Sequence, residues 1–172
     1  MSDELKELLK DLKSSLVLND LDTCYNYIIE QGYEIDEVTP EFTRLLLDSG
    51  INPLDYLKYI PDYYMSGNKL LKNITISDNI KGIGNESFGS CSNLTEIKIP
   101  DNVEYIGDYG FAYCKNLKKV IIGNGCKNIG AYAFSDCPNL TEVTIPEIFK
   151  KRLTIIFGKK KQYLDRINFT FI

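Results

Sequence analysis

The hydrophobic positions of the chain repeat every 23 residues through its middle. Segments 81–103, 104–126 and 127–149 align with one another without a single insertion. Such self-similarity predicts a solenoid, in which every segment forms one coil and stacks on its neighbours. Seven columns match in all three segments, and they hold Ile83, Ile106 and Ile129; Gly84, Gly107 and Gly130; Phe88, Phe111 and Phe134; Cys91, Cys114 and Cys137; Leu94, Leu117 and Leu140; Ile97, Val120 and Val143; and Ile99, Ile122 and Ile145.

The same period extends the pattern in both directions. Residues 58–80 form a fourth, diverged copy, with Met65 in the phenylalanine column and Asn68 in the cysteine column. Residues 150–172 form a degenerate closing copy, in which Phe157 falls on the phenylalanine column. We therefore expect four to five coils over 58–172 with an atypical C-terminal cap, because a terminal coil faces water on one side. After one extra residue, the leucine and strand columns of the closing copy receive Leu164, Ile167 and Phe169.

Each copy contains one short alternating segment. Glu96 and Lys98 alternate with Ile97 and Ile99, which is the period-two pattern of a strand with one buried face. Pro100 follows directly, and because proline lacks a backbone N–H group it ends the strand. The repeats therefore predict one short strand per coil, and stacking these strands builds a parallel sheet.

The segment 83–91, on the other side of the same coil, is interpreted as a short helical or 3₁₀ stretch. Its Phe88 is expected to pack on the strand layer. A single copy cannot bury these side chains by itself. Stacking makes each column continuous and contributes about 1.5–3 kcal/mol for every large apolar side chain that it buries.

Residues 1–57 lack the repeat and show helical spacing instead. Leucines at positions 5, 8, 9, 12 and 16 form one apolar stripe. Gly32 and Gly50 suit helix C-termini, and Pro40 suits the first turn of a helix. We predict a helical N-terminal cap or small helical domain, which together with the solenoid makes a mixed α/β protein. The alternative is that these residues form an independent unit that binds a partner.

The repeat residues carry a family resemblance. The pattern I-G-x-x-x-F-x-x-C-x-x-L-x-x-[IV]-x-I-P resembles the BspA-like leucine-rich repeat, strongly over 58–149 and weakly over 150–172. That family is found in bacterial, phage and some protist proteins, and its members are mostly adhesion or protein-recognition modules. The resemblance therefore implies a leucine-rich-repeat solenoid and a non-enzymatic protein–protein interaction module. Abundant Asn, Ile, Lys and Tyr indicate an AT-rich genome, which fits a bacterial or phage source.

Charge is divided between the two parts of the chain. Residues 1–60 hold 13 acidic and 5 basic residues, a net charge of -8, whereas residues 61–172 hold 11 and 15, a net charge of +4. The basic residues gather near the end, where the run is either a solvated edge or a surface for an acidic partner or the acidic half of a second copy. This candidate basic patch consists of Lys150, Lys151, Arg152, Lys159, Lys160 and Lys161.

The outward side of the predicted strands is the candidate partner-binding face. Stacked coils bring its columns to the spacing of neighbouring strands, so charges of opposite sign form a ladder. These residues either solubilise the sheet or form a polar strip that recognises a protein partner. The first column holds Asn73, Glu96, Lys119 and Glu142, and the second holds Thr75, Lys98, Ile121 and Thr144.

Composition excludes much catalytic chemistry. The chain has no histidine, which removes Ser-His-Asp and Cys-His sites and histidine-ligated zinc. The cysteine column is interpreted as buried thiols that donate to backbone carbonyls, while Cys24 and Cys126 are treated as incidental. We expect no catalytic residue, no metal and no cofactor. Direct nucleic-acid binding is not expected either, because no stacking pattern is interleaved with the basic residues.

The chain lacks both an apolar run of about 18 residues and a secretion signal, so we expect a cytoplasmic protein without a membrane span. The favoured function is binding to a protein partner through the strand face or the acidic N-terminal region. One alternative is an inhibitor that blocks a nucleic-acid-binding host defence protein by charge mimicry. Another is a structural or adhesive repeat that self-associates as a homo-oligomer.

Overall fold

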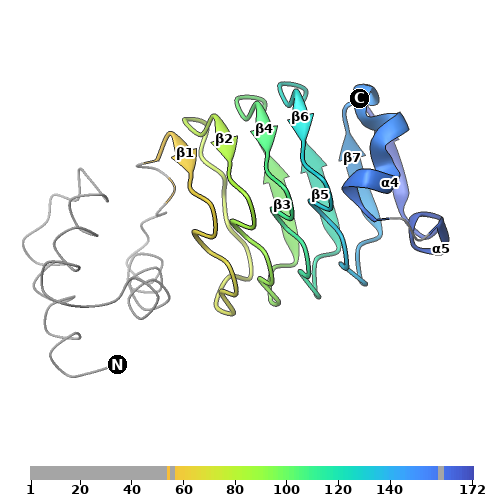
Figure 1. Cartoon of the computed structure of the whole chain (residues 1–172), viewed down its shortest axis with the longest axis horizontal. Helices are drawn as coiled ribbons and strands as arrows, with labels where there is room; N and C mark the ends of the chain where they lie inside the picture. The colour runs from red at the N-terminus through yellow and green to blue at the C-terminus, as the bar shows by residue number, and fades with distance from the viewer. Residues whose placement is uncertain (1–53, 55–56, 159–160) are drawn as a thin grey trace, which may run out of the picture. The chain divides into compact units, whose positions relative to one another are not determined.

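The computed structural model describes Leu54, residues 57–158 and residues 161–172. Over these ranges the chain winds through successive coils that stack side by side (Figure 1). The coils belong to one compact unit, Lys58–Ile172. The predicted helices within residues 1–57 lie outside the described residues, so the N-terminal cap stays a prediction.

Two parallel sheets run along the stack. Each regular coil contributes a two-residue strand to sheet A and then a four-residue strand to sheet B. Sheet A has the order β1 (Tyr59–Ile60), β2 (Gly82–Ile83), β4 (Tyr105–Ile106) and β6 (Asn128–Ile129). Sheet B has the order β3 (Glu96–Ile99), β5 (Lys119–Ile122), β7 (Glu142–Ile145) and β8 (Asn168–Phe171). In Figure 1 the strands β1, β2, β4 and β6 lie along the top of the coils, with β3 and β5 below them.

The strand register confirms the 23-residue period. Ile97 of β3 lies opposite Val120 of β5, which in turn lies opposite Val143 of β7. The first coil joins sheet B through a single bridge between Asn73 and Glu96 instead of a strand. Sequence columns therefore correspond to neighbours in space.

The core consists of the repeated apolar columns, whose side chains within residues 81–149 are at most 1% exposed. Phenylalanine rings form its most regular ladder. The ring centroids of Phe88 and Phe111 are 4.9 Å apart, those of Phe111 and Phe134 are 5.2 Å apart, and those of Phe134 and Phe157 are 5.5 Å apart. Met65 heads the column and is 1% exposed. The predicted positions of Met65 and Phe157 are thus confirmed.

The segment between the two strands of a coil is a succession of turns, so the predicted helical or 3₁₀ stretch at 83–91 is wrong. Left-handed φ angles of 50° at Glu86 and 59° at Ser90 interrupt any helix. The backbone N–H groups of Glu86, Phe88 and Ser90 donate to carbonyls of the next coil at 2.7–2.9 Å. Bonds between coils therefore replace the bonds that a helix would make within itself.

The closing coil is longer than the regular ones. It contains η2 (Glu147–Arg152), α4 (Leu153–Ile156), α5 (Lys161–Leu164) and then β8. Phe169 lies opposite Val143 and Phe171 lies opposite Ile145, which is a spacing of 26 residues. Phe169 therefore does occupy a strand column, but it is the column of Val143 and not that of Ile145, and the prediction that Ile167 occupies a strand column is wrong. The closing coil uses three additional residues, whereas the prediction allowed one. Ile167 is the buried residue that precedes the strand.

Candidate protein-interaction surface

The outward face of sheet B is rigidly positioned by the core beneath it. Ile97, Val120 and Val143 are at most 1% exposed, so the alternate residues of the same strands point to solvent. The burial patterns of β3 and β7 show this alternation, and the β5 residues on that side are half-buried. The predicted candidate residues in these strands do share one face.

The first outward column is a ladder of mixed charge. Glu96 lies opposite Lys119, and Lys119 lies opposite Glu142. The Lys119 Nζ and a Glu142 carboxylate oxygen are 3.7 Å apart, and their side chains are 42% and 60% exposed. Because an exposed pair contributes about 0–1 kcal/mol to stability, these charges remain available to a partner. At the first coil, the Thr95 hydroxyl donates to the side-chain oxygen of Asn73 at 3.0 Å.

The second outward column is less charged. Lys98 lies opposite Ile121, and Ile121 lies opposite Thr144. Lys98 is exposed, whereas Ile121 and Thr144 are half-buried. Thr75 is also exposed but belongs to the coil that has no sheet B strand. Together the two columns form a strip that is polar at both sides and apolar at Ile121.

Two of the three basic-patch residues whose side chains are described make contacts with the rest of the solenoid, Arg152 with the preceding coil and Lys150 within the closing coil. The Arg152 guanidinium donates to the Ile129 carbonyl and to the Asn128 side chain, both at 3.1 Å. The Lys150 Nζ pairs with Glu147 at 2.9 Å and lies over the Phe171 ring. Lys151 is exposed. Lys159, Lys160 and the side chain of Lys161 lie outside the described residues, so the patch as a binding site stays a prediction.

The cysteine column has the predicted structural role. The Sγ of Cys91, Cys114 and Cys137 donates to a carbonyl of the preceding coil at 3.1, 3.2 and 3.3 Å. Burial raises the pKa of the Cys114 thiol to about 12, so it stays protonated at neutral pH. A protonated thiol is a poor nucleophile, which fits an inert core residue. Cys126 is buried in the same way, and burial raises its pKa to about 11.

The described part of the chain contains neither a cluster of candidate metal ligands nor a helix that could span a membrane. Among residues 57–158 and 161–172, no three His, Cys, Asp or Glu side chains are placed to hold a metal ion. The described helices are also too short and polar to cross a membrane.

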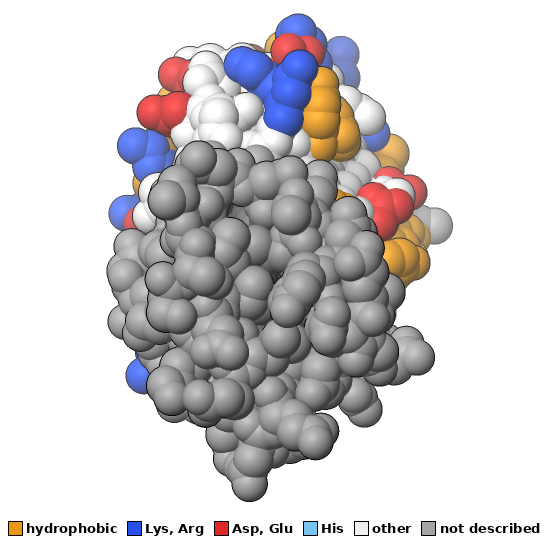
Figure 2. All heavy atoms as spheres, turned by 90° about the vertical axis from the view of Figure 1, so that its left-hand side faces the viewer, with side chains coloured by type: hydrophobic (Ala, Val, Ile, Leu, Met, Phe, Trp, Pro, Cys, Tyr) orange, Lys and Arg blue, Asp and Glu red, His pale blue; other side chains and the backbone are white. Residues whose placement is uncertain are grey.

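In the view of Figure 2, basic, acidic and hydrophobic side chains are intermixed on the visible described surface.

Comparison with known proteins identifies the repeat. The family model described as "BspA type Leucine rich repeat region" matches residues 47–170 of the chain in six copies. The chain belongs to the BspA-type leucine-rich repeat family. A crystal structure of a leucine-rich repeat protein from Bacteroides ovatus is similar, with 30% sequence identity and a TM-score of 0.59. That match covers 67% of this chain and 28% of the Bacteroides chain. No curated protein matches.

Membership of the BspA-type family confirms the predicted fold of parallel strands in stacked coils. Leucine-rich repeat proteins commonly serve as protein-interaction modules and are generally non-catalytic. The Bacteroides structure is described only as a leucine-rich repeat protein, so it names no partner. What this chain binds therefore has to be argued from its own surface.

A polar ladder along sheet A escaped the sequence interpretation. The Asp62 carboxylate accepts from the Asn85 backbone N–H at 2.6 Å, and the Asn85 side chain accepts from the Asp108 N–H at 2.8 Å. Asp108 in turn accepts from the Ala131 N–H at 2.7 Å. The signal was present, because these residues share one column directly after the BspA-type glycine column. The glycines matter here because a Cβ at Gly107 would lie 2.6 Å from the Asn85 nitrogen.

A cavity of about 1050 Å³ opens where the closing coil departs from the BspA-type repeat. It is lined by the aromatic side chains of Tyr113, Tyr132 and Tyr163 and by Arg166. The Tyr163 hydroxyl is already committed, because it donates to the Cys137 carbonyl at 2.7 Å. Ser135 also lines this cavity, and its hydroxyl is buried without a partner among the described residues.

Proposed function

We propose that the chain is a non-catalytic module that binds a protein partner through the outward face of sheet B. The observation that carries this proposal is the registered ladder of Glu96, Lys119 and Glu142 on the strands β3, β5 and β7, whose opposite side chains are buried. A rigid face loses little conformational entropy when a partner binds, and its charges select partners of complementary pattern. The half-buried Ile121 beside this ladder adds apolar contact area.

Affinity capture with a charge-altered face tests this proposal. The full chain and a Glu96→Ala, Lys119→Ala, Glu142→Ala triple variant are immobilised and exposed to lysate of the source cells. We expect a protein that the wild type recovers to be lost from the triple variant, because central charged residues of an interface set its specificity. A matched control replaces Lys127 and Glu104, an exposed ion pair at 2.9 Å outside sheet B, with alanine.

The two variants separate the outcomes. Recovery of the partner by the Lys127/Glu104 control and its loss from the triple variant would support the strand face. Equal recovery by both variants would exclude the strand face as the binding surface. Near-UV circular dichroism of both variants excludes unfolding as the cause.

Self-association is a second candidate, and one end of the stack favours it. Ile148, Ile155 and Ile172 of the closing coil are 67%, 47% and 46% exposed, and β8 pairs with β7 alone among the described strands. Sedimentation at low and high salt tests this candidate. Dimers that dissociate as salt rises would indicate docking of the acidic part on the basic end, and a monomer at both salt concentrations would exclude self-association. The other alternative, an inhibitor that blocks a nucleic-acid-binding host defence protein by charge mimicry, depends on the acidic residues 1–57 and stays a prediction.

A further inference from the structure

A groove with two unlike walls runs across the strands of sheet A. Its volume is about 470 Å³, and backbone of the strands and of the glycine column forms its floor. Tyr59 and Tyr105 stand on one side, and Asp62 and Asp108 stand on the other. These two aspartates are the charged residues among those that line the groove. The groove lies on sheet A, so a ligand there would leave the sheet B face free.

The tyrosine wall depends on a glycine in the coil between its two members. The Tyr105 ring lies directly over Gly82, where a Cβ would fall 2.1 Å from the ring Cε1. The ring therefore leans back toward Tyr59, and the two centroids are 6.4 Å apart with an interplanar angle of 22°. The two side chains are 48% and 38% exposed. Among the described residues neither hydroxyl has a hydrogen-bond partner, so neither is committed to a contact within the coils.

The acidic wall keeps one free acceptor at its centre. Both Asp62 oxygens accept from Asn85, from its backbone at 2.6 Å and from its side chain at 3.1 Å. One Asp108 oxygen accepts from Ala131, and within the described residues the other oxygen accepts no hydrogen bond. Asp108 is thus held in place and can still take a cationic donor.

The spacing of the tyrosine rings selects an extended ligand. Tyr59 and Tyr105 come from coils two apart, but because Tyr105 leans over Gly82 their ring centroids are 6.4 Å apart. A polyproline II helix has three residues per turn and advances about 3.1 Å per residue, so prolines two residues apart are separated by about 6.2 Å. Its carbonyls are solvated and free to accept from tyrosine hydroxyls, and aromatic-lined grooves are the usual docking sites for such segments.

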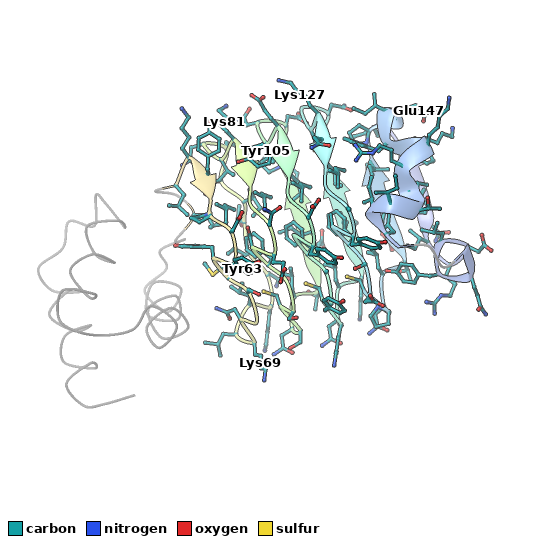
Figure 3. The ribbon with its side chains drawn as sticks, in the orientation of Figure 1. Tyr63, Lys69, Lys81, Tyr105, Lys127 and Glu147 are labelled. Carbon is teal, nitrogen blue, oxygen red and sulfur yellow. The ribbon has the colours of Figure 1, made fainter. Side chains whose placement is uncertain are left out.

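We propose that this groove binds a proline-rich segment of a partner protein in the polyproline II conformation, with proline rings on Tyr59 and Tyr105 and a lysine or arginine side chain at Asp108. The Lys58 Nζ lies over the Tyr59 ring, 5.6 Å from its centroid, but Lys58 does not line the groove. Lys81 and Lys127 lie with Tyr105 along one edge of the coils (Figure 3), and neither lines the groove. Lys127 is also paired with Glu104 at 2.9 Å.

Titration of the full chain with defined peptides tests the ligand class. The probe is an acetylated hexaproline peptide that ends in arginine amide, and the comparison peptide replaces the prolines with three Gly-Ser pairs. We expect the proline probe to bind at least about tenfold more tightly, because its conformation is preformed. The amide resonances of Gly84, Gly107 and Asp108 should shift during that titration. Equal binding of both peptides, or shifts confined to other amides, would overturn the proposal.

Substitutions drawn from the same columns test the two walls without disturbing the coil. Tyr105→Asn introduces the residue that this column carries at Asn128, and Asp108→Asn introduces the residue found at Asn85. We expect Tyr105→Asn to weaken binding of the probe by about tenfold or more, since a central aromatic contact is lost. Asp108→Asn should weaken it by about fivefold but leave binding of a hexaproline–glutamine peptide unchanged.

The matched control is Tyr113→Ser, which removes a tyrosine of similar exposure, 49%, outside the groove. This column already holds Ser90, so the coil tolerates serine there. We expect Tyr113→Ser and the sheet B triple variant to bind the probe as tightly as the wild type. A loss in Tyr113→Ser equal to that in Tyr105→Asn, or no loss in Tyr105→Asn, would overturn the assignment of the groove.

Discussion

Two residues in each regular coil hold a left-handed backbone conformation, and most of them are not glycine. One column has φ angles of 50–61° at Tyr63, Glu86, Tyr109 and Tyr132, and the other has 51–73° at Gly67, Ser90, Tyr113 and Asp136. A left-handed angle costs an ordinary residue about 1–2 kcal/mol. The coil stabilises it because N–H groups in these turns donate to the next coil.

Ser90→Gly should therefore raise the free energy of unfolding by about 0.5–1 kcal/mol, because relief of the left-handed strain exceeds the added entropy of the unfolded glycine. Gly67 already occupies this column with a φ of 73°. Urea denaturation measures the change. Ser92→Gly, at a position without a left-handed angle, should lower stability instead. Stabilisation by Ser92→Gly equal to that by Ser90→Gly would contradict this explanation.

The buried thiols give stability a dependence on alkaline pH. Burial raises the pKa of Cys114 from 9.0 to about 12 in the folded chain, so above pH 9 the unfolded state loses a proton that the folded state keeps. The contribution of this thiol is complete below about pH 8 and falls as pH rises from 9 toward 12, by up to about 1.4 kcal/mol per pH unit.

We expect the difference in unfolding free energy between wild type and Cys114→Ala to shrink by about 1 kcal/mol between pH 8 and pH 10. Urea denaturation under reducing conditions measures this difference. Comparing the two proteins cancels the titration of tyrosines and lysines that both contain. A difference that stays constant over this range would show that the thiol is not buried as the structure has it.

At the scale of elements, the phenylalanine ladder holds neighbouring coils together. Phe111 has a ring on each side, at 4.9 and 5.2 Å, and is fully buried. We expect Phe111→Ala to lower the free energy of unfolding by about 3–5 kcal/mol, since it removes two ring contacts and leaves a cavity. Chemical denaturation tests this, with exposed Tyr113→Ser as control. A cost below about 1 kcal/mol would mean that the coils do not stack through this column.

At the closing coil, a side chain and not a further strand provides the hydrogen bond to the last strand of sheet A. In the regular coils, the carbonyls of Ile60, Ile83 and Ile106 accept from the glycine N–H of the next coil. The corresponding Ile129 carbonyl accepts from the Arg152 guanidinium. Sequence reasoning assigned Arg152 to a basic surface patch, because charge alone does not reveal which carbonyl lacks a partner. Of the three additional residues in this coil, the sequence analysis predicted one and missed two, since the repeat is degenerate there.

Arg152→Ala should lower the free energy of unfolding by about 1–3 kcal/mol, because it leaves the partly buried Ile129 carbonyl without a donor. Lys151→Ala is the matched control, since its side chain is exposed and makes no hydrogen bond or ion pair among the described residues, and we expect a change within about 0.5 kcal/mol. Urea denaturation compares the two variants. Equal effects would assign Arg152 to the surface and not to the end of sheet A.

At the scale of the whole molecule, what could be predicted follows from periodicity. The buried columns and the outward ladder of sheet B recur every 23 residues, so a position in one coil determines its neighbour in the next. The groove on sheet A was not predictable in this way. It depends on Tyr105 leaning over Gly82 toward Tyr59, and that contact crosses two coils and arises only where one column alternates between tyrosine and glycine.

The central claim is that a protein partner contacts the outward face of sheet B. Photo-crosslinking tests it most directly, with a photoreactive residue placed at Lys98 on this face or at Lys127 away from it. Lys98 and Lys127 are both exposed, so a photoreactive residue at either position should crosslink non-specifically to other proteins to a similar extent. We predict that a partner recovered by the wild-type chain is crosslinked from position 98 and not from position 127. Crosslinking of that partner only from position 127 would contradict the claim.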